Sequence, residues 1–155
     1  MAEAQTKAQA EAAAPQPVRL EDYRPPDYLV DQVELRFNLQ PATTEVRARL
    51  AVRRNPAAGR GAGPLVLDGQ ELDLIGLALD GEALGSNRYQ VDDDHLIVHD
   101  VPAAFTLETT VRIRPDANTA LEGLYVSNGV FCTQCEPEGF RKTTYFPDRP
   151  DVMAR

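Results

Sequence analysis

The sequence predicts an all-β protein built from antiparallel sheets, on three observations. Apolar residues recur at every second position in several segments, which is typical of half-buried strands. Turn signals such as Asp80-Gly81 and the acidic run 92–94 separate these segments at intervals of about 8–12 residues. No segment shows a convincing helical period of 3.6 residues. We therefore expect either a sandwich or a curved, saddle-like pair of sheets.

Composition and charge disfavour several classes of partner. The 155 residues include 16 Lys and Arg against 24 Asp and Glu, which gives a net charge of −8. An acidic surface repels nucleic acid and anionic membranes, so we expect neither as a partner. No apolar run approaches the ~18–20 residues of a membrane span. The start of the chain lacks the apolar region of a signal peptide, and two cysteines make no disulfide framework, so we expect a cytoplasmic protein.

The first expected elements are a tail and a long hairpin. Residues 1–19 are rich in Ala, Gln and Glu, and we expect a disordered tail there, with one β-domain over residues 20–155. Apolar and polar residues alternate over 33–39 and again over 46–52, with a turn signal between them. This pattern predicts two antiparallel strands whose outer face carries arginines.

Shorter strands are expected after a glycine-rich loop at residues 55–64. The loop has no following Lys-Ser/Thr and no helix start, which excludes a phosphate-binding loop. Asp68-Gly69 and Asp80-Gly81 are typical hairpin turns, because both residue types tolerate positive φ. The later strands are expected at 65–67, 72–79, 89–91, 95–98 and 105–113.

No residue pattern predicts a metal site. His95 and His99 flank an apolar strand, where four steps span about 13 Å. That distance is too long for one zinc ion with Zn–N bonds of roughly 2.0–2.1 Å. The acidic turn 92–94 lacks the glycine and closing glutamate of a calcium loop, so we interpret it as a solvated turn.

The segment Cys132-Thr133-Gln134-Cys135 has the C-x-x-C spacing but no βαβ unit around it. In a strand, positions i and i+3 point to opposite faces, so the two thiols would not pair easily. If residues 130–136 are extended, Gln134 and Glu136 share a face about 7 Å apart. An amide and a carboxylate at this spacing suit an ammonium group, such as the amino end of a peptide. A plain solvated strand face is the competing interpretation.

Four stretches near the carboxyl end, at residues 118–125, 132–136, 138–141 and 148–152, carry a strong resemblance to a known domain, and the opening at 23–28 carries a weaker one. They resemble the amino-terminal domain of the bacterial aminopeptidase N branch of the M1 zinc aminopeptidases. The opening is similar to the start of that domain's first strand.

The resemblance implies a saddle-like first domain that packs against a thermolysin-like catalytic domain of the same polypeptide. It also implies a peptide substrate, with Glu136 holding the free α-amino group and Gln134 lining the pocket for the first side chain. The family's H-E-x-x-H motif and G-A-M-E-N loop are absent from the 155 residues. We therefore expect no catalytic residue and no zinc ligand in this chain, with zinc belonging to the full-length enzyme. On this interpretation the β-domain is incomplete at its carboxyl end.

Two alternatives remain open from the sequence. The first is a non-catalytic β-sheet module that binds protein partners, which the lack of a complete catalytic set favours. The second is a thiol protein that uses Cys132 and Cys135.

Overall fold

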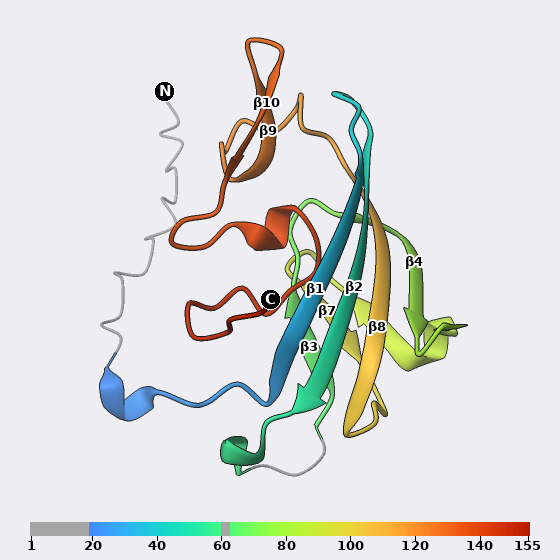
Figure 1. Ribbon diagram of the computed structural model, residues 1–155, viewed down its shortest axis with the longest axis vertical. Coiled ribbons are helices and arrows are strands. Elements are labelled where there is room, and N and C mark those ends of the chain that lie inside the picture. Colours follow the sequence, from blue (N-terminus) through green and yellow to red (C-terminus); the bar gives the residue numbers. More distant parts are fainter. Residues whose placement is uncertain (1–18, 60–62) are drawn as a thin grey trace, which may run out of the picture.

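A computed structural model describes residues 19–59 and 63–155 of the chain. The expected disordered tail, apart from Arg19, and part of the glycine-rich loop lie outside the described residues. The described residues form antiparallel strands and short 3₁₀ turns, which confirms the all-β prediction (Figure 1). The strands are β1 (Tyr28–Asn38), β2 (Thr44–Arg54), β3 (Leu65–Asp68), β4 (Asp73–Leu79), β5 (Glu82–Ala83), β6 (Tyr89–Val91), β7 (His95–Val98), β8 (Ala104–Ile113), β9 (Gly123–Ser127) and β10 (Val130–Gln134). The 3₁₀ turns are η1 (Leu20–Asp22), η2 (Pro56–Ala58), η3 (Ser86–Arg88) and η4 (Phe140–Lys142).

The larger sheet has five strands in the order β1-β2-β8-β4-β5. β1 and β2 form the expected long hairpin, with Val33 opposite Leu50 and Arg36 opposite Arg47. Along β2, buried and exposed residues alternate, so that Val46 and Leu50 face the core while arginines face solvent. This confirms the arginine-bearing outer face. The exposed arginines are paired with acidic neighbours, for example Arg53 with Asp31 at 2.8 Å.

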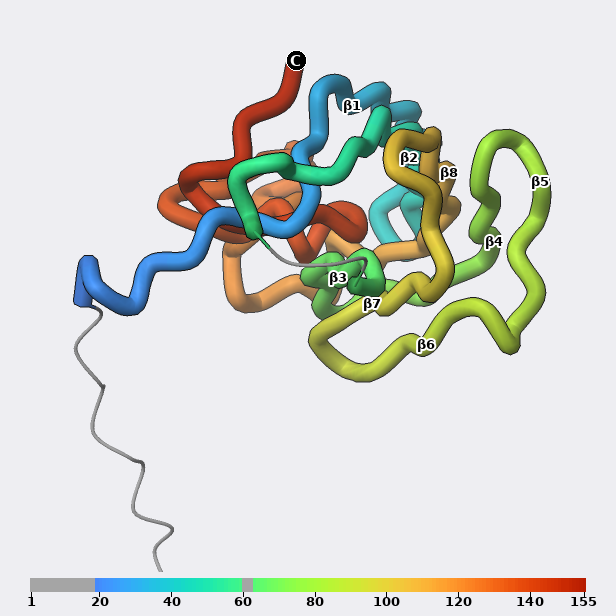
Figure 2. Tube along the Cα trace, turned by 90° about the horizontal axis from the view of Figure 1, so that it is seen from below, coloured from blue at the N-terminus to red at the C-terminus, as the bar shows by residue number. Residues whose placement is uncertain are grey.

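A smaller sheet of three strands, in the order β3-β7-β6, lies against the inner face of the larger one (Figure 2). Leu67 and Leu96 from the small sheet and Leu50 and Leu107 from the large sheet are all fully buried. Burying a side chain of this size contributes about 1.5–3 kcal/mol, so this shared core holds the two sheets together. Tyr145, from the carboxyl-terminal segment, is also buried in this core.

The prediction of a hairpin turn at Asp68-Gly69 is wrong. β3 pairs with β7 and β4 pairs with β8, so the chain crosses from one sheet to the other at this point. Gly69 is needed for a different reason, because an added Cβ would overlap Cε1 of Tyr145. By contrast, Asp80-Gly81 does connect the paired strands β4 and β5, with φ of 51° and 84°.

The carboxyl-terminal segment returns to the beginning of the fold. The backbone N–H of Arg155 donates to Asp31, and the N–H of Val33 donates to the carbonyl of Arg155, at the outer edge of β1. The hydroxyl of Tyr23 donates to the carboxylate of Asp151 at 3.0 Å. These contacts connect the two ends of the described chain.

β9 and β10 form a separate two-stranded hairpin that projects at one end of the molecule (Figure 1). At its base, the side-chain amide of Asn118 donates to the carbonyls of Glu122 and Leu124 at 2.7 and 3.0 Å, which shapes the loop that enters β9. Within residues 19–59 and 63–155, none of the helical turns has the length or apolar character that crossing a bilayer requires.

Candidate functional site

Gln134 is the last residue of β10 and lies opposite Gly123 at the start of β9. Its side chain is exposed. Among the described residues, the Gln134 amide group makes no hydrogen bond, so its donor and acceptor face solvent. Gln134 therefore carries an exposed amide at the base of the projecting hairpin, and its role in binding a substrate stays a prediction.

Glu136 lies beyond the strand. β10 ends at Gln134, and residues 136–138 form a bend that includes a cis peptide bond between Glu136 and Pro137. The strand alternation used to predict a common face for Gln134 and Glu136 therefore does not extend to Glu136. Glu136 is exposed, and its carboxylate has no hydrogen bond or ion pair within the described chain. The pairing of the two side chains on one ligand stays a prediction.

A tight backbone contact fixes the bend against the hairpin. Gly139 has φ of 141°, and a Cβ there would lie 3.1 Å from the carbonyl oxygen of Gln134 and 3.4 Å from the Cα of Cys135. Gly123 faces the same contact, since its added Cβ would lie 3.2 Å from the carbonyl of Gly139. The two glycines let the bend approach the end of β10 closely.

An ionic cluster contacts this bend and holds it in place. We call it the Arg141 cluster, and it consists of Arg141, Asp148, Gln70 and Glu122. Oδ2 of Asp148 accepts the backbone N–H of Gly139 at 2.9 Å and a guanidinium N–H of Arg141 at 2.9 Å. Arg141 also donates through Nε to Gln70 at 3.0 Å and lies 3.4 Å from the carboxylate of Glu122. The cluster thereby connects the bend to the start of β9 and to the loop after β3.

The charge on Arg141 is stabilised by its surroundings. Partial burial opposes the charged form, but the hydrogen bond and the charge of Asp148, with smaller contributions from Glu122 and Glu138, raise the pKa of Arg141 above its usual value. The Asp148 side chain is 10% exposed and that of Arg141 is 21% exposed. Removing Arg141 would leave the largely buried carboxylate of Asp148 without its counterion.

The two cysteines are free thiols, and both are partly buried. Cys132 lies in β10 and Cys135 lies just after it. Burial raises the pKa of the Cys135 thiol, and the nearby charge of Asp148 adds to this, while a hydrogen bond from Gly123 lowers it. A thiol with a raised pKa is a poor nucleophile at neutral pH, which argues against the thiol-protein alternative.

The acidic turn and the histidines form local structure. Oδ1 of Asp92 accepts the backbone N–H groups of Asp94 and His95 at 2.9 and 2.7 Å. These bonds, with His95, lower the pKa of Asp92, although burial acts against them. Among the described residues, no three His, Cys, Asp or Glu side chains gather where a metal ion could be held. This part of the chain therefore does not fit a zinc ion.

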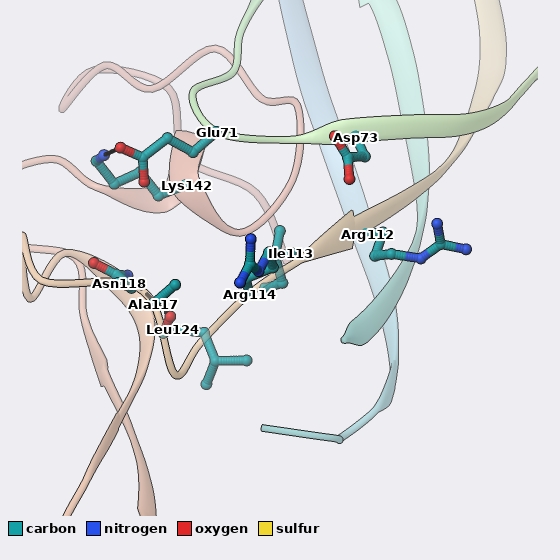
Figure 3. Close-up of a pocket in the computed structure, with 9 residues that line it drawn as sticks. All are labelled: Glu71, Asp73, Arg112, Ile113, Arg114, Ala117, Asn118, Leu124 and Lys142. Carbon is teal, nitrogen blue, oxygen red and sulfur yellow. Dashed lines mark hydrogen bonds and ion pairs between the residues drawn. The ribbon is translucent and has the colours of Figure 1, made fainter. Parts of the chain in front are cut away.

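A hollow of about 300 Å³ lies between the end of β8, the start of β9 and η4 (Figure 3). Lys142 crosses one side of it to reach Glu71 at 3.4 Å, and Arg114 and Asp73 line other parts. Its walls carry charges of both signs, and neither Gln134 nor Glu136 lines it. The hollow is therefore distinct from the pair that the sequence predicted.

Sequence reasoning did not assign a role to Arg141 or Asp148. Both lie in the resembling stretches 138–141 and 148–152, but nothing in local periodicity connects residues seven apart in an irregular segment. Their connection depends on the path of the chain through η4 and the buried residues 143–147, which brings Asp148 back beneath Gly139.

Comparison with known proteins gives a consistent family of relatives. The chain is 50% identical over 141 residues to aminopeptidase N of Caulobacter vibrioides, which covers 91% of this chain and 16% of that protein. It is 41% identical to aminopeptidase N of Escherichia coli over the same shares. The chain thus spans about 16% of the length of these curated relatives. No family model matches it.

Solved structures agree with the sequence comparison. Aminopeptidase A of Legionella pneumophila, in complex with aspartic acid, superposes with a TM-score of 0.81 at 38% identity, over 88% of this chain and 16% of that one. The M1 zinc metallopeptidase of Deinococcus radiodurans superposes with a TM-score of 0.67 at 17% identity, over 83% of this chain and 31% of that one. The second likeness shows a shared fold. The matching region is the amino-terminal part of these enzymes.

Proposed function

Because this chain is a homologue of the bacterial aminopeptidases N of the M1 family over 91% of its length, we propose that it acts within such an aminopeptidase as its amino-terminal β-domain. In this role it supplies one wall of the site that binds the free amino end of a peptide. The β-domain comprises residues 20–155 and works with a catalytic zinc domain on the same polypeptide. We place the whole enzyme in the cytoplasm, with residues 1–19 as an extension outside the domain.

The observation that carries the proposal is that the polar side chains of Gln134 and Glu136 are exposed and unpaired within the described chain. Close by, Asp148, Glu122 and Glu138 all contact Arg141. The carboxylate of Glu136 is therefore available for a cation from outside the chain, while its acidic neighbours are already engaged.

A peptide amino terminus fits such a carboxylate. An ammonium group offers three N–H donors, and its bond to a carboxylate is charge-assisted, about twice as strong as a neutral hydrogen bond. Gln134, two residues earlier, offers both a donor and an acceptor for the first residue of the peptide. Holding the amino end at a fixed place would align the first peptide bond with catalytic groups on another domain. Zinc, when bound by that domain, would activate water and polarise the scissile carbonyl.

The proposal is tested in a chimaera in which this chain replaces the matching 141-residue segment of the Caulobacter relative. Release of an amino-terminal residue from an aminoacyl anilide gives kcat and KM. Losing a charge-assisted bond costs about 1.5–3 kcal/mol, so Glu136→Ala should lower kcat/KM by about tenfold to a hundredfold.

Glu82→Gln is the matched control for Glu136→Gln. Glu82 lies on β5, at the edge of the large sheet, and within the described chain its exposed side chain has no hydrogen bond or ion pair, so both changes remove one negative charge from an exposed site. We expect Glu136→Gln to lower kcat/KM and Glu82→Gln to leave it within about threefold, because a charge acting through solvent at a distance is weak. Equal effects of the two variants, or no effect of Glu136→Ala, would show that Glu136 does not anchor the substrate.

A further inference from the structure

We infer that Asp148 and Arg141 are positioning residues for the substrate wall, acting through Gly139 on Gln134 and Glu136. The inference rests on the proposed function of that wall. Neither residue needs to touch a peptide, since both act through the backbone of the bend that carries Glu136.

The first step is the support of Gly139. Oδ2 of Asp148 accepts the Gly139 N–H at 2.9 Å and the Arg141 N–H at 3.2 Å, so one carboxylate oxygen fixes both ends of the short segment entering η4. The same oxygen binds the guanidinium of Arg141 at 2.9 Å. Hydrogen bonds to a carboxylate are stronger than neutral ones, and this carboxylate is only 10% exposed.

The second step is the contact between Gly139 and the end of β10. At this position the backbone of Gly139 is so near Gln134 and Cys135 that a Cβ would already be 3.1 Å from the Gln134 carbonyl. A shift of Gly139 therefore changes the space available to Gln134 and to the following bend. Glu136 lies between these two fixed points, with Gln134 on one side and Gly139 on the other.

The third step is the anchoring of the cluster itself to the body of the protein. The N–H of Asp148 donates to the Asp68 carboxylate at 2.8 Å. The backbone N–H of Gln70 donates to the carbonyl of Arg141, and Nε of Arg141 donates to the side-chain oxygen of Gln70. Asp68 belongs to β3, which is part of the small sheet. The bend is therefore held relative to the core and not merely to its own hairpin.

Such support should appear mainly in substrate affinity. A carboxylate whose position varies loses part of its interaction with a bound ammonium in both the ground state and the transition state. A loss of this uniform kind raises KM and leaves kcat nearly unchanged. Asp148→Ala in the chimaera should therefore raise KM about tenfold with kcat within about twofold.

Two variants that keep part of the interaction distinguish a positioning role from a general loss of folding. Asp148→Asn keeps an acceptor for Gly139 but loses the charge, and Arg141→Lys keeps the charge but loses the forked geometry, so each should raise KM less than Asp148→Ala. Asp151→Asn is the control, because it also removes one Asp from an ion pair, with Arg149 at 2.7 Å, in the same segment. It should leave KM unchanged.

A second measurement does not depend on activity. Amide hydrogen exchange in the 155-residue chain should show faster exchange at Gly139 in Asp148→Ala and in Asp148→Asn, and unchanged exchange in Asp151→Asn. Faster exchange at Gly139 together with a raised KM supports the inference.

Three results would overturn the inference, and they are distinguishable. If Glu136→Ala raises KM while Asp148→Ala and Asp148→Asn do not, the substrate wall exists but the Arg141 cluster does not position it. If Glu136→Ala itself has no effect, the proposed function is wrong and the positioning role is wrong with it. Unchanged amide exchange at Gly139 in Asp148→Ala would show that Asp148 does not hold Gly139 in place, whatever the kinetic results are.

Discussion

Gly69 lies directly against the ring of Tyr145, so closely that a Cβ at position 69 would overlap Cε1 and Cδ1 of the ring. Tyr145 is 1% exposed and packs in the core, so an added Cβ forces the ring or the backbone at position 69 to shift. We expect Gly69→Ala to lower the free energy of unfolding by about 1–3 kcal/mol or more, as overpacking does. Urea unfolding followed by far-ultraviolet circular dichroism measures this change.

Gly63→Ala is the control for Gly69→Ala, because among the described residues an added Cβ at position 63 meets nothing within 4 Å. It should change stability by less than about 0.5 kcal/mol. Equal costs for the two variants would show that the ring of Tyr145 yields and that the close contact carries no energy.

Gly139 offers a second test of a close approach, now at the proposed substrate wall. Alanine at 139 must adopt φ of 141° and also crowd the carbonyl of Gln134 at 3.1 Å. Gly129, in the turn of the same hairpin, has φ of 79° and nothing within 4 Å of an added Cβ. Gly129→Ala should cost about 1–2 kcal/mol for the backbone alone, and Gly139→Ala should cost at least about 1 kcal/mol more. Thermal or urea unfolding of the two variants checks the difference, and a smaller cost for Gly139→Ala would contradict it.

The ion pair of Asp151 with Arg149 predicts a pH dependence. The hydrogen bond from Arg149 lowers the pKa of Asp151, burial partly opposes it, and the Tyr23 hydroxyl lowers it further. A carboxyl group with a lowered folded-state pKa stabilises the fold above its unfolded pKa of about 3.9, and this contribution is lost as pH falls through the folded pKa. Asp151→Asn should therefore have a lower Tm than the parent at pH 7, and the difference should shrink below about pH 4.

Thermal unfolding at a series of pH values measures this effect. In a protein that already carries Arg149→Gln, adding Asp151→Asn should lower the Tm at pH 7 by less than it does in the parent, because the partner that lowers the pKa of Asp151 is gone. A constant Tm difference between parent and Asp151→Asn from pH 7 to pH 3 would show that the pair does not contribute through its ionisation.

The raised pKa of Cys135 predicts slow alkylation. In a Cys132→Ser variant, iodoacetamide reports on Cys135 alone. Its thiolate fraction should be below that of a free thiol, so the rate should reach half its maximum above about pH 8.5. In strong urea the rate should return to that of an unstructured thiol. A fast reaction at pH 7 in the folded protein would identify Cys135 as an activated thiol instead.

The strand pattern was the most readable part of the sequence. β2 and β8 lie at the centre of the large sheet with one face on the core, so their alternation is strong, with Val46, Leu50 and Leu107 all buried. β1 is less regular because it is the edge strand and its far end leaves Phe37 41% exposed. β9 has five residues, and its boundaries depend on pairing with β10, which no local pattern reports.

The candidate site was predicted less completely, for physical reasons. Gln134 and Glu136 were identified as polar residues in a strand-like run, but Pro137 cannot donate to a ladder and the strand ends at Gln134. The geometry of Glu136 therefore comes from the bend and from the Arg141 cluster. That cluster joins Gln70 to Arg141, 71 residues apart in sequence, and such contacts are set by the packing of the whole domain.

The connection between Tyr23 and Asp151 has a consequence for synthesis on the ribosome. The two residues are 128 positions apart, and the guanidinium of Arg149 bonds to the carbonyl of Arg24 across a similar separation. At about 5–20 residues per second, the segment before β1 waits roughly 6–25 s for these partners to be made. We expect nascent chains stalled before Asp151 to be cleaved by protease near Tyr23, and the released chain to be protected there.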